Sequence, residues 1–295
     1  IQALRDAGRV VEPNRDLHKD EVRQIGRMLG LPEALVARQP FPGPGLGVRM
    51  LCATEPYGLD AYDAVNAELQ AIAAGFGARA CLRRVRNVGV QGDGRSYAYL
   101  ALLEADDFDT LEGFARLRRA AGEIPNRIAR INRLAVNLAP KARPIPGEWK
   151  RITPTTLVPE AIATLRQADA ATTEAFADAG LLADISQLLA VLVPVDLSDL
   201  HTPTEDPRFS PLPNTVFPAQ AGVQTTSPNT STTGHAIGVR AVVTNDFMTA
   251  RPALLGKELP EGFLTTLGER LLRQPGVTAA FYDITSKPPA TVEWE

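Results

Sequence analysis

Residues 85–102 read VRNVGVQGDGRSYAYLAL, which contains two apolar runs separated by Gly92-Asp93-Gly94. The runs Val85–Val90 and Ser96–Leu102 are rich in the β-branched, aromatic and aliphatic residues that favour strands. An Asp-Gly pair between two such runs is a strong signal for a tight turn. The sequence therefore predicts a β-hairpin here.

A helix is expected before this hairpin, and a helix and a strand after it. Tyr62, Val65, Leu69 and Ile72 recur at steps of three and four, which indicates one apolar face of a helix. The same reasoning predicts a helix near 111–121 and a strand near 131–138. The order is helix, strand, strand, helix, strand.

The second half of the chain repeats this order with little residue identity. The expected elements are a helix at 159–179, strands at 188–195 and 237–243, a helix at 263–273 and a strand at 277–284. We therefore predict an α+β fold of two similar units, residues 47–150 and 151–295, in which helices cover one face of each small sheet.

Two stretches are expected to connect units rather than to form them. Residues 40–45, PFPGPG, contain three prolines that remove backbone donors, so they predict a shaped linker after the helices at 19–29 and 33–37. Residues 197–233 are rich in Ser, Thr and Pro and poor in large apolar side chains. Such a segment buries too little surface to offset its ordering entropy, so we expect it to be mobile.

Composition excludes several classes of protein. The 295 residues carry a formal net charge of −3, which predicts no general attraction to nucleic acid or to an anionic membrane. No apolar run approaches the roughly 20 residues that span a bilayer. Two cysteines cannot form a disulfide framework, so a reducing, cytoplasmic location is expected. His18, His201 and His235 show no metal or triad spacing, and we predict no metal site.

Several passages together resemble GMP synthases. They are EPNRDLHKDEVR at 12–23, PFPGPGL at 40–46, VGVQGDGRSY at 88–97, DFMT at 246–249 and YDITSKPPATVEWE at 282–295. Their order and spacing extend over nearly the whole chain, and the last motif is highly specific. The doubled α+β unit is similar to the longer form of that family.

The resemblance implies what the chain would do. That family makes GMP from XMP, ATP and glutamine, and this chain would be its carboxy-terminal, XMP-binding part, self-associating as a homodimer. Residues 1–46 would close the ATP pyrophosphatase domain. The amidotransferase triad and the Ser-Gly-Gly-Val-Asp-Ser loop for ATP do not occur here. The chain alone is therefore expected to hold no catalytic residue, to bind no cofactor and to be inactive, while ATP and magnesium belong to the whole enzyme.

The resemblance also implies four XMP contacts: Lys287 for the phosphate, Glu293 for ribose hydroxyls or a purine N–H, Asp93 in the hairpin turn, and Gln167 for the base or ribose. Each also has an ordinary structural interpretation. Lys287 and Glu293 could be solvated groups on a fraying terminus, Asp93 a plain turn residue and Gln167 a surface residue of a helix. Two prolines after Lys287 predict an extended tail that fixes the direction of its ammonium group.

Arginines near the hairpin could supply local positive potential. Gly92 and Arg95 are possible supporting residues of the XMP site, whereas Arg83 and Arg84 are better explained as a solvated strand face. One position departs from the family: the run Val277–Tyr282 carries Ala279 where an arginine before the last tyrosine would help to bind the phosphate.

A second hypothesis comes from another class of protein. The chain could be a stand-alone nucleotide-binding or dimerisation module with no enzymatic role. The sequence upstream of Ile1 discriminates the two, because an open frame with an ATP-binding loop favours the enzyme.

Overall fold

The computed structural model describes residues 2–36, 39, 45–58, 61–91, 94–138, 152–196, 234–244 and 248–295. The chain divides into two compact units, Ile1–Phe41 and Pro42–Glu295. Residues 40–44 of the predicted linker at 40–45, the segment at 197–233 and the turn residues Gly92 and Asp93 lie outside the described residues.

The first unit contains three short helices, α1 (Gln2–Asp6), α2 (Lys19–Met28) and α3 (Glu33–Val36). Gly30 has a positive φ of 73°, which lets the chain reverse after α2. An ion pair of 2.7 Å between Arg27 and Glu33 links α2 to α3. Within this unit Met28, Leu29 and Leu35 stay exposed.

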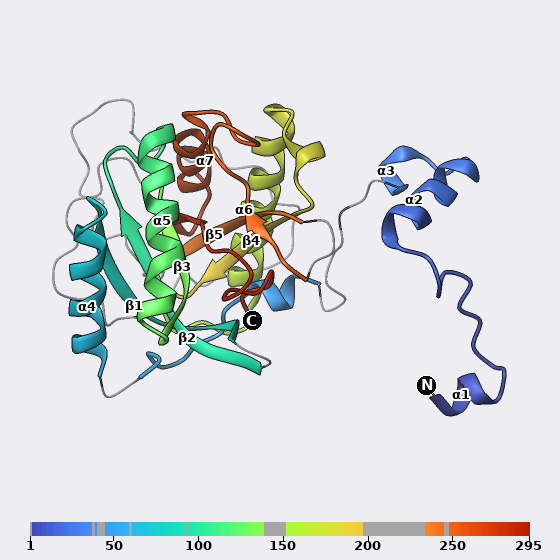
Figure 1. Ribbon diagram of the computed structural model, residues 1–295, viewed down its shortest axis with the longest axis horizontal. Helices are drawn as coiled ribbons and strands as arrows, with labels where there is room; N and C mark the ends of the chain where they lie inside the picture. Colours follow the sequence, from blue (N-terminus) through green and yellow to red (C-terminus); the bar gives the residue numbers. More distant parts are fainter. Residues whose placement is uncertain are drawn as a thin grey trace, which may run out of the picture. The chain divides into compact units, whose positions relative to one another are not determined.

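The second unit is built on one mixed, seven-stranded sheet (Figure 1). The main path of the sheet has the order β1-β2-β3-β7-β5-β4, and the short β6 pairs with β5. The strands are β1 (Arg79–Gln91), β2 (Gly94–Glu104), β3 (Ile131–Asn137), β4 (Gln187–Val193), β5 (His235–Val243), β6 (Arg251–Pro252) and β7 (Val277–Asp283).

The order of antiparallel and parallel strand pairs is the same from either end of this path. β1 is antiparallel to β2, which is parallel to β3; β4 is antiparallel to β5, which is parallel to β7. At the centre β3 and β7 pair antiparallel through Ala135 with Asp283, Val136 with Tyr282, and Asn137 with Phe281. We expected two small sheets, and the structure joins the halves into one. The pairing satisfies backbone groups that two separate sheets would leave on open edges.

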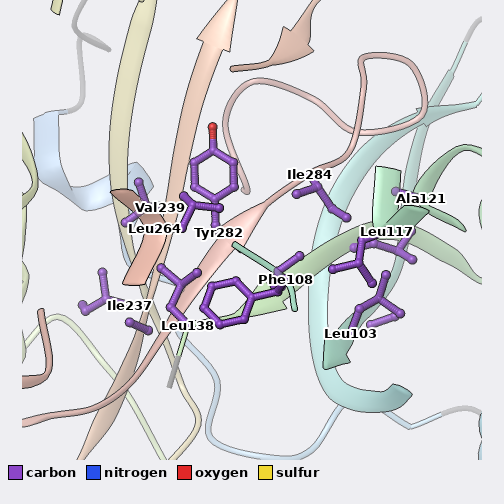
Figure 2. Packing of buried hydrophobic residues seen from close by; sticks show 14 of the residues in the cluster. Leu103, Phe108, Leu117, Ala121, Leu138, Ile237, Val239, Leu264, Tyr282 and Ile284 are labelled. Atoms are coloured by element: carbon purple, nitrogen blue, oxygen red, sulfur yellow. The ribbon is translucent and has the colours of Figure 1, made fainter. Parts of the chain in front are cut away.

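Four helices cover one face of the sheet: α4 (Tyr62–Ala74), α5 (Leu111–Arg127), α6 (Pro159–Asp178) and α7 (Phe263–Leu272). Their apolar sides meet alternate strand residues in one continuous core (Figure 2). In that core Leu117 of α5, Leu264 of α7 and Tyr282 of β7 are fully buried. The short 3-10 helices η1 (Gly45–Arg49) and η2 (Leu182–Asp184) complete the fold.

A second, smaller core covers the opposite face of the sheet. It joins strand residues of both halves to Trp294 near the carboxyl end of the chain. Its members are Leu51, Cys81, Val85, Leu100, Leu102, Ala135, Leu189, Val191, Val193, Val195, Ala236, Ala279, Phe281 and Trp294. The terminal segment is therefore part of the folded structure rather than a frayed end.

The predicted α+β class agrees with this mixed sheet and its helices. The hairpin strands are longer than expected, and α5 continues to Arg127 past Pro125. The two-residue β6 was not expected, because it is too short for any periodicity. In the described part of the chain, no helix has both the length and the apolar character to cross a membrane.

Candidate functional site

The carboxyl-terminal segment, residues 286–295, lies along β1 of the other half. The Val88 amide donates to the Trp294 carbonyl at 3.0 Å, and the Val90 amide donates to the Pro289 carbonyl at 2.7 Å. This segment, called the tail below, carries Lys287 and Glu293. The tail belongs to the second half of the chain, but hydrogen bonds from the first half help to hold it in place.

Gly89 permits this close approach. A Cβ atom at this position would lie 2.5 Å from the Pro289 carbonyl oxygen and 2.6 Å from Nδ2 of Asn132. Both distances are shorter than real Cβ contacts, so any other residue would displace the tail or β1.

Arg133 of β3 is the main anchor of the tail. Its guanidinium is fully buried and donates to the carbonyls of Thr291 and Glu293 at 3.2 and 3.0 Å. It also lies 4.7 Å from the ring centroid of Trp294 and forms an ion pair with Asp283. Burial lowers the pKa of Arg133 to about 10, and the charge of Asp283 opposes that effect.

Asp283 joins the cations of both halves. Its carboxylate is fully buried and pairs with Arg133 and, at 2.7 Å, with Arg240 of β5. The Thr285 amide donates to its other oxygen at 2.9 Å. Burial alone would raise the pKa of Asp283, but Arg240, Arg133 and the amide outweigh it and hold that pKa below its ordinary value.

Trp294 packs the end of the tail against the sheet. Its side chain is fully buried, and a Cβ at Gly238 of β5 would lie 2.7 Å from its ring. The glycine leaves the space that the indole fills.

Lys287 is half-buried at a turn of the tail. Its backbone pairs with Ala250, with N–H···O distances of 2.7 and 3.2 Å. The Ala290 amide donates to the Ser286 carbonyl at 3.1 Å, so the chain turns here. The extended conformation that we expected from the two prolines is wrong, because this hydrogen bond and the Ala250 pairing fold residues 286–290 back.

Glu293 is half-buried and has one oxygen without a partner. Its Oε1 accepts from Nε2 of Gln187 at 3.4 Å, and its Oε2 is buried with no hydrogen-bond partner among the described residues. Burial raises the pKa of Glu293, and the charge of Arg49 and the Gln187 hydrogen bond oppose the rise. The carboxylate thus has unused acceptor capacity.

Gln167 is exposed on α6, two residues before Asp169. Asp169 forms an ion pair of 2.8 Å with Arg49, whose side chain is buried. The positive charge of Arg49 also opposes the rise in the pKa of Glu293 that burial causes. Among the described residues, no hydrogen bond joins Gln167 to the tail.

The hairpin residues are placed in part. Arg95 is exposed at the start of β2, opposite Val90, while Asp93 and Gly92 lie outside the described residues. The solvated face expected for Arg83 and Arg84 is wrong for Arg83, which is 3% exposed. The pairing of β1 shifts register after Arg83, and this irregularity breaks the simple alternation of inward and outward side chains.

Ala279 is buried within β7, so its position faces the small core and not a ligand. The matched run in the first half is Ile131-Asn132-Arg133 of β3, and it supplies the arginine that β7 lacks. The arginine expected near Ala279 thus occurs at the matched position of the first half, and this signal could have identified Arg133 from sequence. Arg49, Arg118 and Arg240 gave no such signal.

In the described part of the chain, no group of three or more His, Cys, Asp or Glu side chains is arranged to hold a metal ion. His235 is instead held by Thr155 at 3.0 Å, and burial lowers its pKa.

Comparison with known proteins identifies related sequences. Residues 216–294 match the family described as GMP synthase C terminal domain. A glutamine-hydrolyzing GMP synthase of Dictyostelium discoideum is 33% identical over 100% of this chain and 42% of its own length. A probable GMP synthase of Leptospira interrogans is 31% identical, over 100% of this chain and 41% of its own length.

A GMP synthase of Mycobacterium tuberculosis is 41% identical but matches only 48% of this chain and 30% of its own length. The chain spans about two-fifths of the length of the curated relatives that match it from end to end.

Proposed function

We propose that this chain, which belongs to the GMP synthase family, is the part of such an enzyme that binds XMP and joins two subunits. Its relatives in that family match it along its whole length. The whole enzyme converts XMP to GMP with ATP and glutamine, in purine nucleotide biosynthesis in the cytoplasm. This part supplies contacts and orientation to the substrate, while the other domains carry out adenylation and ammonia transfer.

The observation that carries the proposal is the unpartnered oxygen of Glu293. A buried acceptor without a donor is costly, and a bound ribose hydroxyl or purine N–H would supply that donor. Lys287 lies on the same folded tail, so a cation for the phosphate and an acceptor for the nucleoside share one rigid segment. Arg133, Gly89 and Trp294 hold that segment in place.

The domain assignment follows the same reasoning. Residues 1–46 close an ATP pyrophosphatase domain, and residues 47–150 and 151–295 are two related α+β units. The pairing of the sheet supports the relation of the units, because each half has an antiparallel pair followed by a parallel strand. The end-to-end match of two relatives and the partial mycobacterial match fit a longer and a shorter form.

A stand-alone module without enzymatic role is not favoured, because the matched relatives are named as synthases. We assign no catalytic residue and no cofactor to this chain. By itself it is expected to release no pyrophosphate from ATP and XMP.

Substitutions in the tail of the full enzyme test the proposal. Lys287→Ala and Glu293→Ala should each raise the KM for XMP about tenfold to a hundredfold, because a charge-assisted hydrogen bond is worth about 1.5–3 kcal/mol. The KM for ATP should stay unchanged. Glu295→Ala is the matched control, since that acid is exposed on the same tail. Unchanged XMP dependence in both Lys287→Ala and Glu293→Ala would contradict the proposal.

A further inference from the structure

The start of the tail is clamped by a helix of the opposite half. Ile284 belongs to the same apolar core as Leu117 and Ala121 of α5 (Figure 2). Arg118, the residue after Leu117, donates from Nη1 to the Ile284 carbonyl and from Nη2 to Oγ of Ser286 at 3.2 Å. The guanidinium therefore fixes the two residues that flank Thr285, directly before Lys287.

Other contacts fix the neighbouring positions and leave Arg118 a distinct role. Arg240 donates to the Thr285 carbonyl at 3.0 Å, and Ala250 pairs with the backbone of Lys287. Within the described part of the chain, Arg118 is the side chain that donates to the Ser286 hydroxyl. The orientation of Ser286, and with it the exit direction of Lys287, depends on this contact.

Burial lowers the pKa of Arg118, and the charge of Asp283 opposes this effect only from beyond ion-pair distance. Arg118 is half-buried, yet no carboxylate of the described chain lies within ion-pair distance of it. Asp283 is already shared by Arg133 and Arg240, and Arg251 is paired with Glu258. A half-buried cation without an anion is unfavourable, so this place suits an external anion.

We propose that Arg118 is a positioning residue of a phosphate subsite: it orients Ser286 and Lys287 and adds a second positive charge beside one phosphate monoester. The inference rests on the proposed function, because the monoester is the phosphate of the substrate nucleotide. It also gives the site a second cation, which the buried Ala279 cannot provide.

The test compares a nucleotide with its nucleoside in the full enzyme. XMP and xanthosine differ only by the phosphate, so the ratio of their dissociation constants isolates the subsite. Arg118→Met should weaken XMP binding about tenfold, the equivalent of about 1.4 kcal/mol, and leave xanthosine within about twofold. Arg118→Lys keeps the charge but cannot contact both Ile284 and Ser286 as the planar guanidinium does, so it should recover only part of the loss. Arg119→Met is the control, because Arg119 is exposed on the same helix.

Ser286→Ala keeps the inference testable if Arg118→Met does not fold, since it removes only the hydroxyl that Arg118 contacts. It should weaken XMP severalfold and spare xanthosine. Equal loss of both ligands, or no loss of XMP, in these variants overturns the inference even when Lys287→Ala still weakens XMP. If the unsubstituted enzyme binds XMP no better than xanthosine, the proposed function fails as well.

Discussion

The two halves of the sheet share one strand pairing but carry different side chains at matched positions. β3 and β7 pair about Val136 and Tyr282. Three residues before that centre, β3 carries Arg133 and β7 carries Ala279. The guanidinium of the first half reaches across to the tail, whereas the methyl group of the second half packs in the small core.

The residues just after the centre differ as well. Asn137 of the first half donates to Glu104 at 3.0 Å, while in the second half Asp283 accepts from Arg240. Both pairs are buried. The first half thus places its acid on β2, and the second half places its acid on β7, within reach of Arg133.

This difference shows how one backbone design can be used for two tasks. The first half contributes Arg133, on which the tail docks. The second half contributes the tail and Asp283, the carboxylate that pairs with Arg133. Neither half has both parts. The candidate site therefore requires both halves, although its proposed XMP contacts on the tail come from only one of them.

The largest expected effect comes from removing the arginine that makes the halves different. Arg133→Met leaves Asp283 with one cation and removes five hydrogen-bond contacts to the tail and β1, since the side chain bonds Asn87, Val88, Thr291 and Glu293. Breaking a buried ion pair in this way should lower the free energy of unfolding by about 3–5 kcal/mol. Urea unfolding followed by circular dichroism measures it.

Adding an arginine at the matched position of the second half should not restore the stability lost in Arg133→Met. Ala279→Arg places a guanidinium in an apolar core, so the double variant with Arg133→Met should be less stable than either single variant. Arg119→Met, at an exposed site, should change stability by no more than about 0.5 kcal/mol. A loss below about 1 kcal/mol for Arg133→Met would mean that the halves do not differ in the way described.

A smaller effect is expected where the tail meets β1. Gly89→Ala should cost about 1–3 kcal/mol, because its Cβ would overlap Pro289 and Asn132. Gly94→Ala is the matched control on the same hairpin, since nothing lies within 4 Å of its Cβ. Hydrogen exchange of residues 286–295 should increase only in Gly89→Ala. Equal exchange in both variants would show that the tail does not depend on this contact.

The smallest expected effect on stability is a pH dependence that differs between the carboxylates of Glu293 and Asp283. Burial raises the pKa of Glu293, so as pH falls through that raised pKa the folded protein takes up a proton more readily than the unfolded chain and is stabilised. Asp283 has a lowered pKa, so its contribution is present above the unfolded pKa and is lost as pH falls through the folded one.

Glu293→Gln sharpens this contrast. The variant should be at least as stable as the unsubstituted protein at neutral pH, because a neutral amide replaces a buried carboxylate. In the full enzyme the variant should bind XMP more weakly at neutral pH. Protonation of Glu293 should weaken XMP binding by the unsubstituted enzyme at acidic pH, and the variant should not show this decline. Pairing pH-dependent unfolding with XMP titration measures both. A marked loss of stability in Glu293→Gln would give this carboxylate a structural role.

Local pattern predicted most of the elements. The apolar run Ser96–Leu102 and the apolar steps from Tyr62 to Ile72 report burial within one strand or helix, and the structure has β2 and α4 there. The joining of β3 to β7 was not predictable in this way, because it pairs residues about 146 positions apart in sequence and depends on which edges remain open after each half forms.

The candidate site was predictable only in part for the same reason. The resemblance pointed to Lys287 and Glu293, and the structure places both on one docked tail. The anchors Arg118, Arg133 and Arg240 come from distant segments, and sequence spacing does not show which arginines fold inward. An arginine on a strand resembles a solvated residue until the partner that neutralises it is known.

The docking of the tail on Arg133 also sets an order in time. Thr291 follows Arg133 by 158 residues, so a ribosome working at about 5–20 residues per second makes the anchor roughly 8–30 s before its ligand. During that interval the nascent chain holds Asn87 and Val88, which contact the guanidinium, but neither Asp283 nor the tail. A half-made chain therefore keeps a solvated cation in the middle of its future interior, which delays closure of the small core until the second half arrives.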